Sequence, residues 1–279
     1  MNSYNMLALL RDNVAEAVAS HWTDVNLLRR MNFCQMQVGM KVAMKASNWL
    51  TKRATVTPVA SIITLPSDCA KPLHLEEVTS GRPLGWIGGP SFRRLTRNPS
   101  GFGELTELNA YALKNSIEVN QADYTTQCYL WYQQRVPDLH TGTASAGGAG
   151  TLTLSTNEVS VASNEDDYYN DVYIEVFDGT GEGTKAQITD YVGSTHACTV
   201  AGTFGADSVY GTLSVLPPET LFVVVLKATV AALSKPGSRL DEKVFQYYVS
   251  QLSTEEKQLD SWLADQVPMA ARVEMTEWE

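Results

Sequence analysis

Residues 217–234 read PPETLFVVVLKATVAALS, and this stretch constrains the arrangement of the whole chain. Pro218 suits the first turn of a helix, where the N–H group that proline lacks would have no partner. The residues that follow, Thr220–Ser234, form a strongly apolar segment interrupted by Lys227. A helix that is apolar on nearly every side must be covered by other elements. We therefore expect this helix to be buried.

Three more helices are predicted, and all lie near the ends of the sequence. Apolar residues recur three and four positions apart over residues 4–20, and a similar spacing marks residues 241–264. A longer helix over residues 25–49 has a broad apolar face and can be capped by Thr23 or Asp24. Its basic residues, which either face solvent or contact an acidic neighbour, are Arg29, Arg30, Lys41 and Lys45.

The centre of the chain carries short segments in which apolar and polar residues alternate in part, a pattern typical of β-strands. These segments are residues 54–59, 62–65, 73–78, 84–87, 110–114, 116–119 and 127–133. We expect them to form a small β-sheet beside the helices. Residues 127–133 are apolar on both sides, which predicts a strand that is covered on both faces.

The composition changes sharply after residue 140. Residues 141–150, TGTASAGGAG, have the content of a flexible linker. From residue 151 to 216 only β patterns occur, separated by glycine-rich turns, which is typical of a small all-β module.

The predicted fold class is α+β. It consists of an α-helical bundle, built from two N-terminal and two C-terminal helices, with a small β-sheet and an inserted all-β module that is Ig-like (immunoglobulin-like) or a small sandwich. The predicted domains are a core over residues 1–140 and 217–267, the inserted module over 141–216 and an extended C-terminal tail over 268–279.

Charge is distributed unevenly along the chain. The net charge is -10, which argues against wrapping by nucleic acid, because phosphate binding needs a cationic face. Residues 1–60 nevertheless have a net charge of +4, and residues 141–216 have one of -9. The N-terminus lacks the basic region of a signal peptide, and the longest apolar run, 221–233, is too short to span a bilayer. We expect assembly in a cytoplasm-like milieu and no membrane contact.

The sequence contains no pattern that is specific for catalysis. Nucleophile-elbow, zincin, phosphate-loop and kinase signatures do not occur. The densest acidic cluster is Glu165, Asp166 and Asp167 with Asp171 nearby; a solvated loop is the favoured interpretation and a divalent-metal site the alternative. The segment Asp178–Gly183 fits a hairpin turn better than a phosphate or calcium loop. We predict a protein that is not an enzyme and holds no cofactor or metal.

We interpret the isolated cysteines and histidines as structural residues. Neither type occurs at metal-ligand spacing. Cys34, Cys69, Cys128 and Cys198 are predicted to be buried small apolar residues. The four histidines, His21, His74, His140 and His196, are expected in ordinary surface or core positions.

Three stretches together resemble the head-to-tail adaptor (connector) family of tailed bacteriophages. The first runs from Trp49-Leu50-Thr51 through Leu65-Pro66-Ser67-Asp68 and Lys71-Pro72-Leu73 to Gly81-Arg82. The second comprises Tyr111, Asn115, Ile117 and Val119, followed by Leu130-Trp131-Tyr132 and Val136-Pro137-Asp138-Leu139. The third is the helical pair between Pro218 and Val267, with Ala228, Ala231 and Ala232 in its first helix. The resemblance covers residues 1–140 and 217–267, and compact family members lack an equivalent of residues 141–216.

The resemblance implies a structural virion protein. Its subunits, twelve by analogy, would form a ring beneath the portal protein, continue the channel for the genomic DNA without sequence-specific binding, and present a platform to the tail nozzle or other tail proteins. The implied location is the neck of the virion, at the head-tail interface, after assembly in the host cytoplasm. A cyclic ring needs complementary faces on each subunit, which the basic N-terminal region and the acidic remainder can supply.

Two sets of site residues follow from this hypothesis. A tail that binds the portal would use Met269, Arg272, Met275 and Trp278, for which a disordered terminus is the alternative. An intersubunit basic loop would use Arg93, Arg94 and Arg97, for which DNA contact and plain solvation are the alternatives.

Three other functions stay open at the level of sequence. The first is a tail-nozzle or fibre-anchoring virion component, with the inserted module as its working part. The second is a module that binds carbohydrate or a host surface. The third is a metal-dependent hydrolase that uses Glu165, Asp166 and Asp171.

Overall fold

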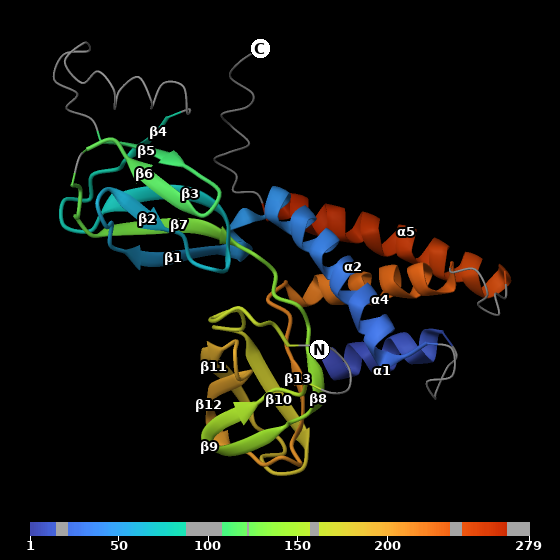
Figure 1. Ribbon diagram of the computed structural model, residues 1–279. Helices are drawn as coiled ribbons and strands as arrows, with labels where there is room; N and C mark the ends of the chain where they lie inside the picture. The colour runs from blue at the N-terminus through green and yellow to red at the C-terminus, as the bar shows by residue number, and fades with distance from the viewer. Residues whose placement is uncertain (15–21, 88–107, 122, 157–161, 235–241, 267–279) are drawn as a thin grey trace, which may run out of the picture. The chain divides into compact units, whose positions relative to one another are not determined.

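A computed structural model describes residues 1–14, 22–87, 108–121, 123–156, 162–234 and 242–266 (Figure 1). Thirteen β-strands in three sheets and four α-helices occur within these residues. The chain divides into two compact units. The main unit comprises Met1–Leu50 and Val136–Glu279, and the double-sheet unit comprises Thr51–Arg135.

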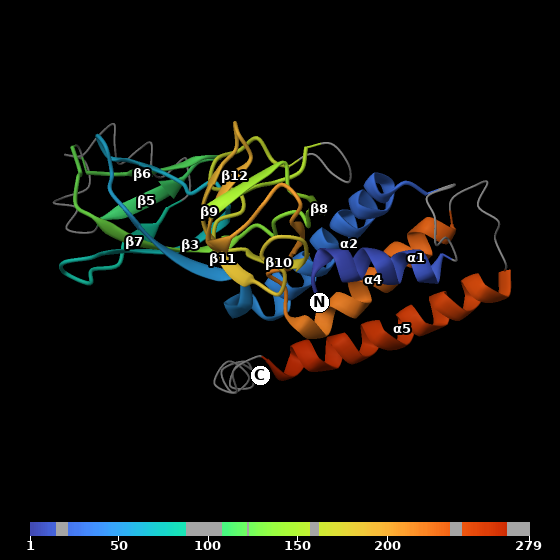
Figure 2. The same ribbon diagram turned by 90° about the horizontal axis from the view of Figure 1, so that it is seen from below.

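The main unit has four described helices, and one of them, α4 (Pro218–Leu233), contacts the other three. The others are α1 (Ser3–Asn13), α2 (Asp24–Lys45) and α5 (Glu242–Asp265). Helix α4 lies between α2 and α5 (Figure 2). The expectation that this apolar helix is buried is confirmed, because its residues from Leu221 to Leu233 include no exposed apolar side chain. Among the described helices, none has the length and hydropathy to cross a membrane.

Local signals set where the helices begin. The Thr23 hydroxyl caps α2 by accepting a hydrogen bond from the backbone N–H of Asn26 at 3.3 Å. The Asn2 side chain caps α1 in the same way by accepting from Asn5 at 2.9 Å. Helix α4 starts at Pro218, as predicted. A short 3₁₀ helix, η1 (Ser47–Leu50), follows α2.

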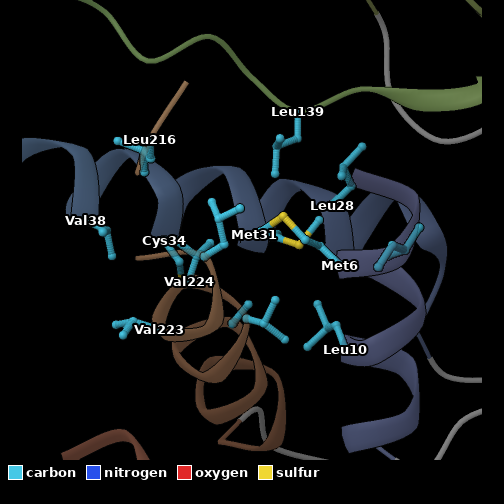
Figure 3. Packing of buried hydrophobic residues seen from close by; sticks show 14 of the residues in the cluster. Met6, Leu10, Leu28, Met31, Cys34, Val38, Leu139, Leu216, Val223 and Val224 are labelled. Atoms are coloured by element: carbon cyan, nitrogen blue, oxygen red, sulfur yellow. The ribbon is translucent and has the colours of Figure 1, made fainter. Parts of the chain in front are cut away.

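The core of the helices is a continuous cluster of buried apolar side chains from all four helices (Figure 3). Val223 and Val224 of α4 pack with side chains of α1 and α2 and with Leu139 and Leu216 from the connections to the adjoining sheet. Members drawn from α1 and α2 are Met6, Leu10, Leu28, Met31, Cys34 and Val38.

A six-stranded sheet, called the half-barrel here, completes the main unit. Its order is β8-β13-β10-β11-β12-β9, and every neighbouring pair is antiparallel. The bounds are β8 (Thr141–Thr143), β9 (Ala146–Thr153), β10 (Tyr173–Asp178), β11 (Lys185–Val192), β12 (Ala197–Thr203) and β13 (Val209–Thr212). Only Ala144 and Ser145 separate the two edge strands, so the sheet must curl to bring its edges together. Its concave side encloses a core that includes Leu152, Tyr169, Ile174, Ile188, Tyr191 and Tyr210.

The start of α1 is attached to the half-barrel. Asn2 forms an isolated bridge with Leu213, and its amide donates to Glu175 Oε2 at 2.6 Å. The Ser3 hydroxyl donates to the carbonyl of His140 at 2.7 Å. These contacts join the first residues of the chain to β10 and to the ends of β8 and β13, which are neighbouring strands at one edge of the half-barrel.

The double-sheet unit consists of two small sheets around one core. The three-stranded sheet has the antiparallel order β1-β7-β3, formed by β1 (Thr51–Val56), β7 (Cys128–Gln134) and β3 (Cys69–Glu77). The four-stranded sheet has the order β2-β6-β5-β4, formed by β2 (Ile62–Thr64), β6 (Ser116–Val119), β5 (Asn109–Ala112) and β4 (Gly85–Trp86). Both sheets contribute to the core, whose members include Ile63, Leu75, Ala110, Ile117, Leu130 and Tyr132.

The predicted fold class is wrong. Among the described residues, thirteen strands in three sheets outnumber four α-helices, and a helical bundle with one small sheet is not seen. The helices surround α4 instead of sharing a bundle axis, and the central strands build two sheets with their own core. The predicted Ig-like or small-sandwich module is a single curled sheet. The predicted domain limits stay predictions.

Two local predictions are also wrong. Residues 141–150 were expected to be a linker, but they contain β8 and the first part of β9. Small residues are needed there because a Cβ at Gly147 would lie 2.6 Å from the backbone of Phe204. Strand β7 was expected to be covered on both faces, but only Cys128, Leu130 and Tyr132 are buried, and the alternate side chains are partly exposed.

Candidate interaction surface

The acidic cluster of the half-barrel organises turns. Asp166 accepts a hydrogen bond from the backbone N–H of Gly193 at 2.8 Å, and Asp167 accepts from the Asn170 side chain at 2.7 Å. Asp167 and Asp171 both have positive φ, a conformation that aspartate adopts in turns. No group of three or more His, Cys, Asp or Glu residues that could hold a metal ion occurs in the described part of the chain.

The segment Asp178–Gly183 forms the hairpin turn that was predicted. It connects the antiparallel strands β10 and β11. Gly179, Gly181 and Gly183 all have φ between 80° and 89°, which favours glycine because a Cβ is disfavoured there. A Cβ at Gly179 would also lie 2.1 Å from the Asp207 carbonyl oxygen. These glycines are therefore explained by the backbone conformation of the turn.

His140 is a buried structural residue. Its Nδ1 lies 2.9 Å from the Tyr210 hydroxyl, and the two rings stack with centroids 5.7 Å apart. The Tyr210 oxygen also accepts from the backbone N–H of Ser155 at 2.6 Å, and burial holds the pKa of this tyrosine well above its usual range. The tyrosine therefore keeps its proton, which it can donate to His140. This arrangement satisfies buried polar groups at one end of the half-barrel.

The four cysteines are free and buried, as predicted. Burial raises the pKa of the Cys34 and Cys69 thiols to about 11 and that of Cys198 to about 12, and it also raises the pKa of Cys128. Thiols with such pKa values stay protonated near neutral pH and are poor nucleophiles.

The feature that stands out on the main unit is the outer face of α2. Phe33, Met36, Met40 and Met44 follow one another at spacings of three and four residues, so they share one face of the helix. Their exposed fractions are 57%, 47%, 54% and 85%. We call these four residues the α2 stripe. It extends about 16 Å along the helix at ~1.5 Å per residue.

The opposite face of α2 is buried within the chain. Leu28, Met31, Val38 and Val42 are buried against the rest of the helical core. One flank is fixed by Asp260 of α5, which accepts hydrogen bonds from Lys41 at 2.8 Å and Lys45 at 2.5 Å. For these two lysines the acidic-neighbour alternative is confirmed. The stripe is thus a second apolar face on a helix whose first apolar face is covered.

A half-open pocket of about 370 Å³ lies at the N-terminal end of the stripe. Its lining residues are Trp22, Asn26, Arg29, Arg30, Phe33, Cys34 and Ala231. Arg30 is held in place, since its guanidinium lies 4.7 Å from the centre of the Trp22 ring and donates to the Ala231 carbonyl at 2.8 Å. The pocket combines an apolar wall with two guanidinium groups, which suits an apolar side chain next to an acidic one.

The site residues predicted from sequence fall outside the described residues. This holds for Arg93, Arg94 and Arg97 of the basic loop and for Met269, Arg272, Met275 and Trp278 of the tail. The α2 stripe was not distinguished from the sequence, because the broad apolar face predicted for this helix mixed buried and exposed positions. A helical wheel that separates Phe33, Met36, Met40 and Met44 from the positions of Leu28 and Met31 would have found it.

Comparison of the sequence with protein families and with curated proteins identified no relative. No protein-family model matches this chain, and no curated protein sequence matches it.

Proposed function

We propose that this protein is a structural subunit of a tailed-bacteriophage virion, which forms a ring between the portal protein and the tail and continues the DNA channel. The resemblance of residues 1–140 and 217–267 to the adaptor family motivates the choice of assembly. The α2 stripe is the observation that carries the proposal. It is a face built for contact with another protein, because apolar side chains in a row on an otherwise folded surface are costly in water.

The charge distribution is compatible with ring formation. A cyclic assembly uses two different faces of each subunit, one complementary to the other. Residues 51–135 contain nine Lys or Arg and seven Asp or Glu, a net charge of +2, so the remaining residues have a net charge of -12. Regions of opposite net charge on one chain are compatible with head-to-tail association of copies.

The test is the mass of the complex formed with the portal protein of the same genome, measured by light scattering after size exclusion. We expect a discrete species with about one copy of this protein per portal subunit. A Met36→Ser/Met40→Ser variant should lose that species while its circular dichroism stays unchanged. Tyr247→Gln, which removes an exposed apolar side chain from α5, is the matched control and should assemble normally.

Failure to associate, with this protein folded and the portal rings intact, would reject the adaptor assignment. The tail-nozzle or fibre-anchoring alternative would then be tested by mixing with the corresponding tail proteins. Normal assembly of the Met36→Ser/Met40→Ser variant would instead show that the stripe is not the contact.

A further inference from the structure

The outer face of the three-stranded sheet carries aromatic side chains that the core does not use. In β7 the buried residues Cys128, Leu130 and Tyr132 point to the core, so Tyr129 and Trp131 lie on the other face. Their ring centroids are 5.9 Å apart in an edge-to-face arrangement. Because the rings are nearly perpendicular, each partly exposed ring can offer a face to a different flat group.

Residues with cationic or ionisable nitrogen groups flank these rings on both neighbouring strands. Arg53 of β1 and His74 of β3 are the register partners of Trp131. The Arg53 guanidinium lies 4.4 Å from the Tyr129 centroid and 5.8 Å from that of Trp131, and the His74 ring lies 5.4 Å from Trp131. In the next row, Lys71 is the partner of Gln133.

The charges of this face are largely unneutralised. Glu76 is its one acidic residue in the paired rows, and it lies 3.5 Å from His74. Within the described residues, the exposed Arg53 and Lys71 have no carboxylate partner. In the described part of the chain, the face therefore has two cations without a carboxylate partner beside a pair of aromatic rings, in a chain whose net charge is -10.

We propose that this face, defined by Arg53, Lys71, His74, Tyr129 and Trp131, binds single-stranded nucleic acid. Unpaired bases stack on aromatic side chains, and the phosphates between them are attracted to lysine and arginine nearby. A sheet surface presents the rings and cations in fixed rows, as in sheet-based RNA-binding modules. A duplex hides its bases inside the stack, so it can engage the cations but not the rings. This proposal does not depend on the proposed ring around the DNA channel, because DNA would pass through that channel without being bound.

Fluorescence anisotropy with the full chain tests the proposal. The probes are labelled oligo(dT) and oligo(rU) of about 12 nucleotides, within the usual site size of a single module. We expect both to bind and a duplex of the same length to bind about tenfold more weakly. With two phosphate contacts, the logarithm of the binding constant should fall against the logarithm of salt concentration with a slope of about -1.4. A clear preference for one probe would identify DNA or RNA as the natural ligand.

Single substitutions separate the contribution of ring stacking to affinity from that of positive charge. Trp131→Leu keeps an apolar side chain on the sheet but removes the large ring, and it should weaken binding about tenfold. Arg53→Gln should weaken it less and reduce the salt slope to about half. Lys114→Gln, an exposed lysine between β5 and β6 in the same unit, is the matched charge control and should change affinity less than twofold.

Three results would overturn the proposal. They are no binding of either probe at low salt, equal binding of single strand and duplex, and unchanged affinity of a folded Trp131→Leu variant. Competition by poly-glutamate at the same concentration as oligo(dT) would also overturn it, and would indicate an acidic protein segment as the partner of this face.

Discussion

Helices α2 and α4 pack against each other and both have apolar residues on more than one side, yet their surroundings differ. The apolar side chains of α4 are covered by α1, α2 and α5. Those of α2 are covered on one face, while Phe33, Met36, Met40 and Met44 remain exposed on the other. Apolar residues on several sides of a helix thus predict that much of it is buried, and only the structure shows which apolar face the chain leaves exposed.

The largest expected effect contrasts the two faces of α2. Leu28→Ala removes a fully buried side chain and should lower the free energy of unfolding by about 2–5 kcal/mol. Met40→Ala on the stripe should change it by less than about 0.5 kcal/mol. Urea unfolding followed by circular dichroism measures both. Equal losses would mean that the stripe is covered within the free chain.

An intermediate effect is expected where α2 approaches the chain segment that leads to the half-barrel. A Cβ at Gly39 would lie 2.7 Å from Cγ2 of Val136 and 3.6 Å from Cδ2 of Leu216. Gly39→Leu should therefore destabilise the protein by about 1–3 kcal/mol, although leucine is the better helix former. Thermal unfolding of Gly39→Ala and Gly39→Leu should show a larger loss for leucine. A stabilised Gly39→Leu variant would contradict the close packing.

The smallest effect is expected at the ion pairs between α2 and α5. Hydrogen bonds from Lys41 and Lys45 lower the pKa of Asp260, and all three groups are partly exposed. Asp260→Asn should cost less than about 1 kcal/mol at neutral pH. The ionised Asp260 contributes this stability above the pKa of an unfolded aspartate, about 3.9. The stabilisation is lost as the pH falls through the lower pKa that Asp260 has in the folded protein.

The pH dependence is measured by urea unfolding of wild type and Asp260→Asn at several pH values. Their stabilities should converge in acid. Glu255→Gln on the same helix is the control for loss of one negative charge. A difference between wild type and Asp260→Asn that grew towards low pH would have the wrong sign for this ion pair.

The helices could be predicted from sequence because their signals are local. Thr23 caps the following turn through its own side chain, and Pro218 sets the start of α4 through its fixed φ. The predicted start of α2 and both predicted ends of α4 and α5 lie within two residues of those observed, whereas α2 ends at Lys45, four residues before the predicted end. Such signals involve residues only a few positions apart, so they do not depend on the rest of the fold.

The sheets and the candidate surface could not be predicted in the same way. Strand β9 pairs with β12, about fifty residues later, and its Gly147 is explained by the backbone that passes close by at Phe204. Without that partner, residues 141–150 have the composition of a linker. The α2 stripe was missed because the broad apolar face predicted over residues 25–49 did not separate the exposed Met36 and Met44 from the buried Met31.

The pairing of β8 with β13 has a consequence for how this chain can be changed. Thr141 and Gly211 are register partners, so the polypeptide enters the half-barrel after β7 and leaves it towards α4 at neighbouring points. The entropy cost of closing such an excursion grows only slowly with its length. Evolution can therefore lengthen, shorten or exchange the intervening segment as a cassette. For an engineer, the turns between the native strands are the places to insert a foreign segment, because Glu175 of β10 holds Asn2 at the start of α1.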